Sequence, residues 1–184
     1  MEPIRVATPL TDDAIAGLEA GDRVLLSGVI YTARDAAHAR LVELLHRGEP
    51  LPIDLKDQVI YYAGPSPARP GRIVGSLGPT TSGRMDAYTL TLLHAGLKGM
   101  IGKGYRSREV VDAVVRHGAV YFAATGGAAA LLAKKVVKCD VVAYEDLGCE
   151  AIHRLEVVDF PLIVINDSQG RDFYAENQSR YVLV

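Results

Sequence analysis

The chain has 184 residues, of which 49% are hydrophobic and 23% charged. This length can bury roughly 70% of the surface that the unfolded chain exposes, and the composition is that of a globular protein rather than a disordered or fibrous one. The net charge of -2, with 20 Lys and Arg spread along the chain against 22 Asp and Glu, excludes a general nucleic-acid or membrane-surface binder. We expect one domain over residues 1–184, in which any recognition of anions is local.

No basic start leads into an apolar run, and no apolar stretch approaches the roughly 20 residues that span a bilayer. The sequence therefore favours a cytoplasmic protein. Cys139 and Cys149 are the two cysteines of the chain, which excludes a disulfide scaffold. They are too few to hold an iron–sulfur cluster or a structural zinc ion alone, and we interpret them as buried or surface thiols, with a redox pair as the alternative.

The first elements alternate between helix and strand. Thr11 is expected to cap a short helix that stops at Gly21, and the apolar residues 24–30 predict a buried strand. Residues 36–46 carry apolar side chains on one helical face, with Gly48 as the stop. Residues 59–63 and 73–77 then predict two strands on either side of a loop rich in proline and glycine.

The alternation continues beyond this loop. We expect a helix that Ser107 caps over residues 109–117, among further helices at 87–95 and 128–136 and strands at 99–102, 120–124 and 141–144. Such β/α alternation predicts a parallel sheet with crossover helices. Residues 152–158 and 162–166 alternate more loosely and favour a second, partly antiparallel layer.

Three cations follow predicted strands directly. Arg34 comes after residues 24–30, Arg84 after residues 73–77, and Lys103 lies between two glycines after residues 99–102. Because ligands of parallel α/β proteins gather at the carboxyl ends of strands, we expect the three to line one cleft. The alternative for each is an ordinary solvated charge.

The loop of residues 78–86 carries hydroxyls and a guanidinium on a turn bounded by proline and glycine. Thr80 and Thr81 can donate hydrogen bonds, and Arg84 offers two parallel donors to a carboxylate. A helix N-terminus that a Thr or Ser merely caps is the alternative. Together with Lys103 the loop predicts a cleft for a small dicarboxylate, and this is half an active site, since the residues show no metal site and no nucleophile paired with a base.

Several polar residues near these positions have simpler structural interpretations. Asp35 either orients the Arg34 guanidinium or, more simply, caps the following helix. His38 and His46 lack a second ligand at metal-binding spacing and are interpreted as surface or helix-end residues. Residues 124–127 and 166–168 are interpreted as turns, the former with some chance of lining the site.

The motifs together resemble the β subunit of class I fumarate hydratases and L-tartrate dehydratases. The similarity runs from about Thr8 to Tyr174 and is carried by residues 30–38, 62–65, 75–86, 102–104 and 124–130. It implies a swivelling β/β/α domain with a central, mainly parallel sheet, helices on one side and a second, smaller sheet. It also implies a reversible hydro-lyase whose [4Fe-4S] cluster is held by a separate α subunit or an N-terminal domain, so that Cys139 and Cys149 are not cluster ligands.

Carried over by motif, the resemblance implies that Arg34, Arg84, Thr81 and Lys103 bind substrate carboxylates, and that Thr80 takes or returns the proton on carbon. A threonine hydroxyl is a weak base at neutral pH, so Lys103 or a carboxylate of the partner is expected to lower its pKa. Fumarate, L-tartrate and mesaconate remain open as substrates, and αβ pairs are expected to assemble further. A non-catalytic anion-binding lid of a partner enzyme is the competing interpretation.

Overall fold

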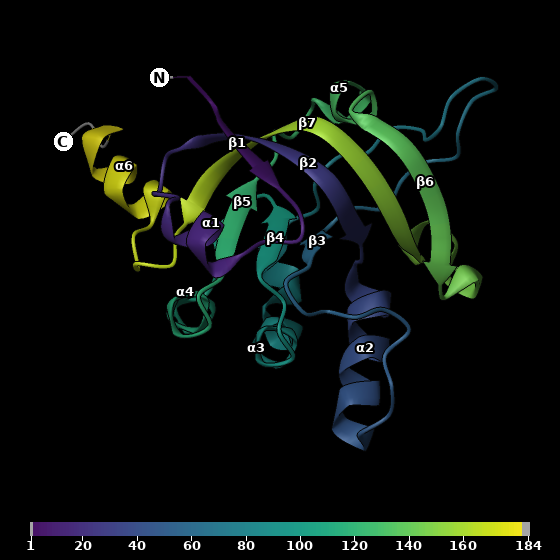
Figure 1. Cartoon of the computed structure of the whole chain (residues 1–184), viewed down its shortest axis with the longest axis horizontal. Coiled ribbons are helices and arrows are strands. Elements are labelled where there is room, and N and C mark those ends of the chain that lie inside the picture. The colour runs from purple at the N-terminus through teal and green to yellow at the C-terminus, as the bar shows by residue number, and fades with distance from the viewer. Residues whose placement is uncertain (1, 182–184) are drawn as a thin grey trace.

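In the computed structural model, which describes residues 2–181, five parallel strands run through the first two thirds of the chain. Their alternation with helices confirms the expected mixed α/β class (Figure 1). The strands are β1 (Ile4–Ala7), β2 (Arg23–Thr32), β3 (Val59–Tyr61), β4 (Gly99–Gly102), β5 (Val120–Ala123), β6 (Val136–Ala143) and β7 (Ile152–Asn166). The helices are α1 (Asp12–Ala16), α2 (Asp35–Arg47), α3 (Asp86–His94), α4 (Arg108–Arg116), α5 (Ala129–Ala133) and α6 (Phe173–Tyr181), with 3-10 helices η1 (Ser82–Met85) and η2 (Glu145–Glu150).

The last strand closes the sheet into a barrel. Strand β7 pairs antiparallel with both β2 and β5, so that β2, β3, β4, β5 and β7 form a ring, and β1 and β6 extend it at β2 and β7. The separate second sheet expected from the tail is therefore not observed among the described strands. The 15 tail residues of β7 form one strand of the same sheet, and this strand includes Pro161.

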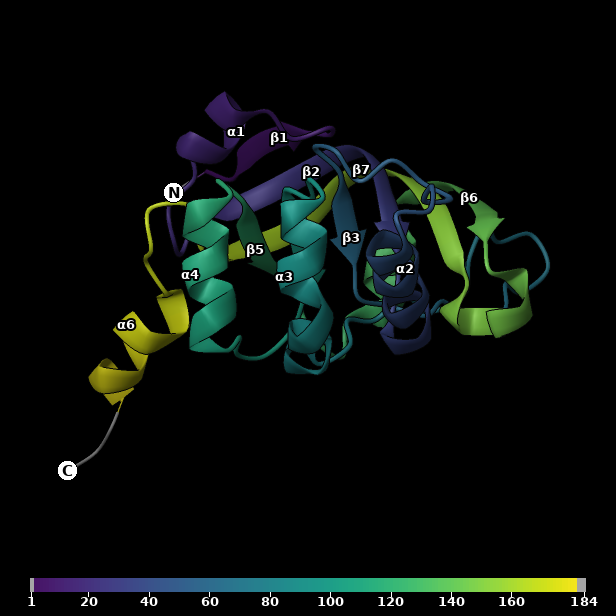
Figure 2. The ribbon, with the colours of Figure 1, turned by 90° about the horizontal axis from the view of Figure 1, so that it is seen from below.

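Side chains of the strands alternate between two hydrophobic cores, as the pleat of a strand requires. On β3 and the residue after it, Val59 and Tyr61 point into the barrel, whereas Ile60 and Tyr62 join the cluster that α2, α3 and α4 cover. Helices α2, α3 and α4 lie side by side along one face of the sheet (Figure 2). This confirms that the main helices lie on one side, and it leaves the ends of the parallel strands accessible.

Local signals gave most helix ends correctly. The hydroxyls of Thr11 and Ser107 accept hydrogen bonds from Ala14 N at 3.2 Å and Val110 N at 3.4 Å. Gly48 ends α2 in the left-handed conformation, with φ of 66°. Capping residues thus act through the local backbone, which is why the sequence reveals them.

Residues 73–77 do not form the predicted strand. Their backbone groups bond to a loop and to a helix: Gly75 N donates to Ser66 O at 3.2 Å, and Leu77 N donates to Ala129 O at 3.2 Å. The proline- and glycine-rich segment folds back on itself, so its extended backbone never reaches the sheet. Helix α5 is also shorter than predicted, because Val136 already belongs to β6, and β1 and α6 were not predicted.

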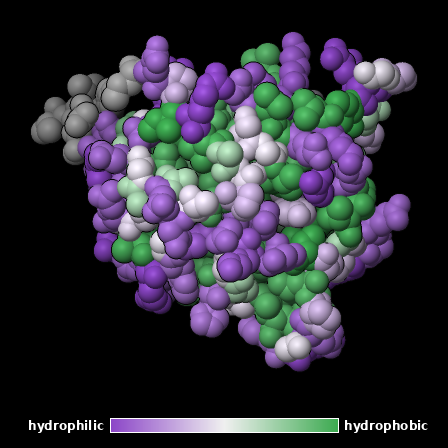
Figure 3. All heavy atoms as spheres, in the orientation of Figure 1, coloured by the Kyte–Doolittle hydropathy of each residue, from purple (hydrophilic) through white to green (hydrophobic). Residues whose placement is uncertain are grey.

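The surface shown in Figure 3 is mostly hydrophilic, with hydrophobic groups over the end of the molecule where β6 lies. Val137, Val141 and Val142 of β6 are exposed. In the described part of the chain, none of the helices is both long and apolar enough to cross a membrane.

Candidate functional site

The candidate residues lie where the parallel strands end. Arg34 follows β2 by two residues, Lys103 follows β4 directly, and the loop with Thr80 and Thr81 lies between them in the chain. Parallel neighbours deliver their carboxyl ends to the same edge of a sheet, where α/β proteins bind ligands. The topology thus brings the predicted residues to one end of the barrel.

Backbone hydrogen bonds fasten the Thr80 loop to Lys103. Thr80 N donates to Tyr62 O at 2.6 Å, Lys103 N donates to Thr80 O at 3.3 Å, and Ser82 N donates to Lys103 O at 2.8 Å. Thr81 and Lys103 form an isolated parallel bridge. The structure therefore places the two threonines beside the lysine, at positions that no spacing in the sequence would relate.

Asp35 joins the two arginines. Its carboxylate accepts from Arg84 Nε at 3.0 Å and lies 2.9 Å from Arg84 Nη2, while Arg34 Nη2 lies 3.9 Å from Asp35 Oδ2. The helix cap expected of Asp35 is wrong: it is the first residue of α2, and Arg34 is the cap residue without a side-chain bond. The alternative, in which Asp35 orients a guanidinium, describes the geometry, although Arg84 is its closer partner.

Glu150 is a site residue that the sequence did not reveal. Its Oε1 lies 3.3 Å from Arg34 Nη2, and its Oε2 accepts from Ala36 N at 3.1 Å, at the start of α2. A carboxylate at a helix N-terminus is favoured by the unpaired N–H groups and the helix dipole. Glu150 comes from η2, more than 100 residues beyond Arg34, so no local motif could have predicted this contact.

The charged side chains are partly exposed. The side chain of Arg84 is 52% exposed and that of Arg34 is 23% exposed. Lys103 is exposed and forms no ion pair with a described residue. Three cations face two carboxylates here, so the site retains local positive charge that suits an anion.

Glycines allow the close approach of these groups. A Cβ on Gly64 would lie 2.8 Å from Cys149 O and 3.2 Å from Arg34 Nη1, and one on Gly126 would lie 3.8 Å from Lys103 Cδ. The loop at residues 124–127 thus borders Lys103, in keeping with the chance that it lines the site. Gly64 lets the chain pass directly beside Arg34, where any side chain would push the guanidinium away.

A buried polar network lies beneath the loop. The Tyr121 hydroxyl is 2.8 Å from Ser82 Oγ and donates to Gly104 O at 2.9 Å. Tyr121 and Ser82 are both fully buried. Burial raises the pKa of Tyr121, so its hydroxyl keeps its proton and remains a donor.

Arg106 extends this network. It donates to Asp86 Oδ1 at 2.7 Å and to Thr89 Oγ1 at 2.7 Å, and its guanidinium lies 5.0 Å from the centre of the Tyr121 ring. Asp86 Oδ2 also accepts from Ser107 N at 2.7 Å. A buried arginine is tolerated because its charge is paired and its donors are used. No local pattern predicted this role, since Arg106 has the surroundings of a surface residue in a polar stretch.

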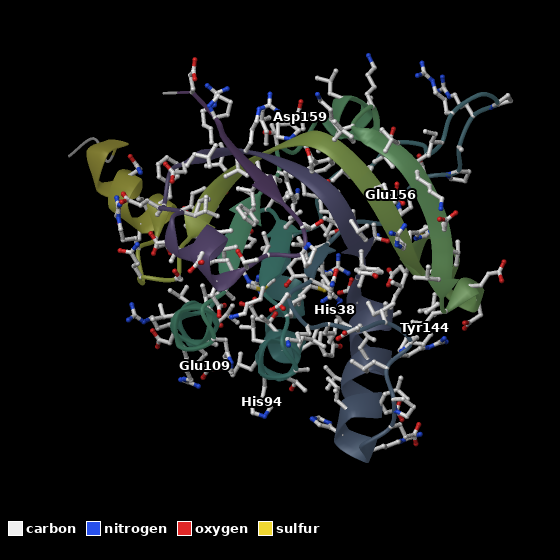
Figure 4. The ribbon with its side chains drawn as sticks, viewed as in Figure 1. His38, His94, Glu109, Tyr144, Glu156 and Asp159 are labelled. Atoms are coloured by element: carbon white, nitrogen blue, oxygen red, sulfur yellow. The ribbon has the colours of Figure 1, made fainter. Side chains whose placement is uncertain are left out.

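His38 is not the surface or helix-end residue that was expected. It is fully buried within α2, and its Nδ1 lies 2.9 Å from Arg34 O (Figure 4). Burial lowers the pKa of His38 to about 4, so the imidazole is neutral and donates from Nδ1 to that carbonyl. His38 therefore supports the backbone at Arg34 from below the site.

The other polar residues outside the site have structural roles. Asp167 accepts from Ala20 N at 2.9 Å and, through its other oxygen, from Gln169 N and Arg171 N, which confirms the turn at residues 166–168. Cys139 is half-buried and Cys149 exposed, and both are free thiols. Within residues 2–181, no three His, Cys, Asp or Glu side chains are grouped so that they could hold a metal ion.

Two cavities of about 490 and 400 Å³ lie farther along the loop of residues 65–76, one against α5 and one against β6. None of Arg34, Thr80, Arg84 and Lys103 lines either cavity.

Comparisons with known proteins place these residues in a family. The model of the family described as Fumarase C-terminus matches residues 1–177. The chain is 47% identical over 84% of its length to the anaerobic class I fumarate hydratase of Escherichia coli K12, and 45% identical over 85% to fumarate hydratase 2 of Leishmania major. It spans 28% of the length of each of these two relatives.

A further relative is of similar size. The chain is 42% identical, over 91% of its length and 89% of the relative, to a Methanocaldococcus jannaschii protein whose name gives it as a candidate L(+)-tartrate dehydratase subunit beta. That name implies an α partner for the M. jannaschii protein. A family match over nearly the whole chain and a relative of matching length agree, and the chain belongs to the fumarase C-terminal family of class I fumarate hydratases and tartrate dehydratase β subunits.

Proposed function

We propose that residues 1–184 form one fumarase β-subunit-like domain, of the swivelling β/β/α kind, that supplies half of the active site of an iron–sulfur hydro-lyase. Residues 1 and 182–184 of this domain lie outside the described part of the structure. The reaction is the reversible hydration of fumarate to L-malate. The observation that carries the proposal is the fastening of Thr80 and Thr81 to Lys103, next to two arginines that share Asp35.

The arginines and the lysine bind the two carboxylates of the substrate. A planar guanidinium binds a carboxylate through two parallel hydrogen bonds, and the Asp35 contacts pre-orient Arg84 for this. Thr81 adds a hydroxyl donor beside Lys103. Holding the substrate at both ends fixes its double bond relative to the loop, which lowers the entropic part of the barrier.

Thr80 transfers the proton at carbon. Its hydroxyl is a weak base, and in this proposal the ammonium of Lys103, whose backbone N–H donates to Thr80 O, stabilises the alkoxide that forms when Thr80 gives its proton to carbon. During hydration Thr80 returns the proton to the carbon next to the one that receives the hydroxyl. General acid–base assistance of this kind contributes roughly 10²- to 10⁴-fold to the rate.

The [4Fe-4S] cluster belongs to a partner α subunit in this proposal. The described residues of this chain offer no fitting set of cluster ligands. The fumarate hydratase relatives are several times longer than this chain, and the M. jannaschii relative is named as one subunit, which supports a second chain. Exposed hydrophobic residues on β6 are further surface that a partner can cover.

L-tartrate dehydration is the second candidate. The relative that matches this chain in length carries that name, and tartrate differs from malate by one hydroxyl. A few polar contacts decide whether an extra hydroxyl is accepted, and in this proposal the partner contributes some of them. Mesaconate, a methylated fumarate, fits the same carboxylate clamp.

The test is anaerobic turnover by this chain co-purified with its α partner after loading with iron and sulfide. Fumarate, L-tartrate and mesaconate are compared side by side, with each chain alone as a control. Rapid turnover of one substrate that requires both chains supports the proposal and names the substrate. A stable pair with an intact cluster but no turnover of any of the three would instead indicate another hydroxy acid or an anion-binding lid.

A further inference from the structure

We propose that the Tyr121 hydroxyl is a positioning group that holds Thr80 and Lys103 in register for proton transfer. This inference rests on the proposed function, because it concerns the same loop and the same step. Tyr121 itself lies beneath the surface and touches no reacting atom. It acts through Ser82 and Gly104, each of which is close in the chain to a proposed catalytic residue.

The direction of the hydrogen bonds shows how the Tyr121 hydroxyl connects the two loops. A tyrosine hydroxyl has one proton, and that of Tyr121 is donated to Gly104 O. The 2.8 Å contact to Ser82 Oγ must then be a bond that Ser82 donates to the Tyr121 oxygen. One hydroxyl therefore ties the loop that carries Thr80 to the loop that carries Lys103, in addition to their backbone bonds.

Close packing around Gly102 keeps the hydrogen bond between Ser82 and Tyr121 short. A Cβ on Gly102 would lie 2.0 Å from Ser82 Oγ and 2.9 Å from the Tyr62 ring, so only glycine allows Ser82 this position. The Arg106 guanidinium lies over the Tyr121 ring and anchors Asp86 at the far end of the loop. The segment from Thr80 to Asp86 is thus held from below at both ends.

The fold itself does not require this polar contact. Replacing a buried hydrogen-bonded pair by apolar groups of the same shape is often nearly neutral for stability, so a serine and a tyrosine at fully buried positions point to a need for exact placement. Proton transfer has that need, since misplacing a catalytic group by about 1 Å can reduce a rate roughly 10²-fold. Carboxylate binding by Arg34 does not depend on this tie, and Arg84, although it lies in the tied segment, keeps the Asp35 contacts that orient its guanidinium.

The experiment compares Tyr121→Phe, Ser82→Ala and the double variant in the αβ pair. We expect kcat to fall at least tenfold in Tyr121→Phe while KM changes less than threefold. The double variant should lose little more than the single ones, because all three remove one interaction. Ser27→Ala is the matched control, because Ser27 Oγ also takes part in one hydrogen bond, accepted from Asp159 N at 3.0 Å, in the half of β2 remote from the site.

Hydrogen exchange of this chain alone gives a readout that does not depend on turnover. Tyr121→Phe should speed amide exchange in residues 80–84 and 102–105 and leave β1 and α6 unchanged. An unchanged kcat, a kcat loss equal to that of Ser27→Ala, or unchanged exchange in both loops would overturn the inference. If the wild-type pair turns over none of the substrates, the proposed function fails instead. The hydrogen-exchange rates then still decide whether the Tyr121 hydroxyl holds the two loops together.

Discussion

At the scale of single residues, the site depends on carboxylates that hold the cations in place. Asp35 contacts both arginines, whereas Glu150 contacts Arg34 and the start of α2. A guanidinium fixed by one carboxylate presents its remaining donors in a defined direction. We therefore propose that both acidic residues belong to the binding apparatus, although the sequence analysis considered only Asp35 for such a role.

Asp35→Asn tests this role. We expect KM for the substrate to rise about tenfold, because an amide attracts Arg84 less strongly than a carboxylate and the arginine loses its fixed orientation. Asp146→Asn is the matched control, since Asp146 also accepts two bonds from an arginine, Arg40, at 2.8 and 2.5 Å on an exposed surface. Steady-state kinetics of the αβ pair decide the matter, and equal KM values for the two variants would contradict the account.

His38 makes the stability of the chain depend on pH. Its pKa is lowered to about 4 by burial, below the value near 6.5 of an unfolded histidine, so the unfolded state binds the proton more tightly. Stability is then full above about pH 6.5 and is lost as the pH falls towards 4. Between pH 7 and pH 5 this amounts to about 2 kcal/mol of unfolding free energy.

Urea unfolding of the wild-type chain and of His38→Gln at the two pH values measures this. Glutamine can keep a bond to the Arg34 carbonyl but does not titrate. The loss of stability from pH 7 to pH 5 should be about 2 kcal/mol smaller in the variant than in the wild type. An equal loss in both would show that His38 is not the group responsible.

At the scale of elements, the pairing of β2 with β7, which helps to close the barrel, contains a bulge. The pairing of β2 with β7 shifts register between Leu26 and Gly28, and Gly28 has φ of 115°, which L side chains rarely adopt. A Cβ there would lie 2.4 Å from Thr8 Oγ1 and 3.0 Å from Thr8 O. Gly28→Ala should therefore lower the unfolding free energy by about 2 to 4 kcal/mol.

Gly17→Ala is the control for this prediction. Gly17 ends α1 with φ of -83°, and a Cβ there meets nothing closer than 3.7 Å, so the change should be nearly neutral. Denaturant unfolding of both variants gives the comparison. Similar stabilities would mean that the bulge tolerates a side chain and that closure does not depend on Gly28.

The sequence predicted those elements whose signals are local. Periodicity and caps predicted α2, α3 and α4 and the parallel strands β2, β3, β4 and β5, since hydroxyl caps and terminal glycines act within one turn. Closure of the barrel by β7 could not be read from the chain, because it pairs residues more than 100 positions apart. The extended residues 73–77 were mistaken for a strand for the same reason: whether an extended segment joins a sheet is decided by its neighbours in space.

In the candidate site, too, residues in local motifs were predicted, whereas residues that come from distant segments were not. Arg34, Thr80, Arg84 and Lys103 were recognised by motif, and the structure brings them to one end of the barrel. Three residues near the site were missed, each for its own reason. Glu150 comes from η2, far along the chain from Arg34. Ser82 faces the buried side of the loop, and Tyr121 belongs to a strand whose sequence is typical of an ordinary core strand. The roles of the recognised residues remain predictions for the pair of chains to test.

At the scale of the whole molecule, we propose an active site that a second chain completes. The four candidate side chains lie at the carboxyl ends of the parallel strands, and the fumarate hydratase relatives are several times longer than this chain. A partner that covers this end would exclude water from the substrate and strengthen each charge interaction there. The central claim is that this chain supplies the proton transfer within such a pair.

Thr80→Val tests that claim most directly, because valine has nearly the shape of threonine without the hydroxyl. The measurement is kcat of the iron-loaded αβ pair, with Thr91→Val on α3 as the matched control and co-purification of the subunits as the check on assembly. We predict a kcat at least about 100-fold below wild type for Thr80→Val, with the pair intact and the control unchanged. A kcat within twofold of wild type would contradict the account and assign the proton transfer to the partner.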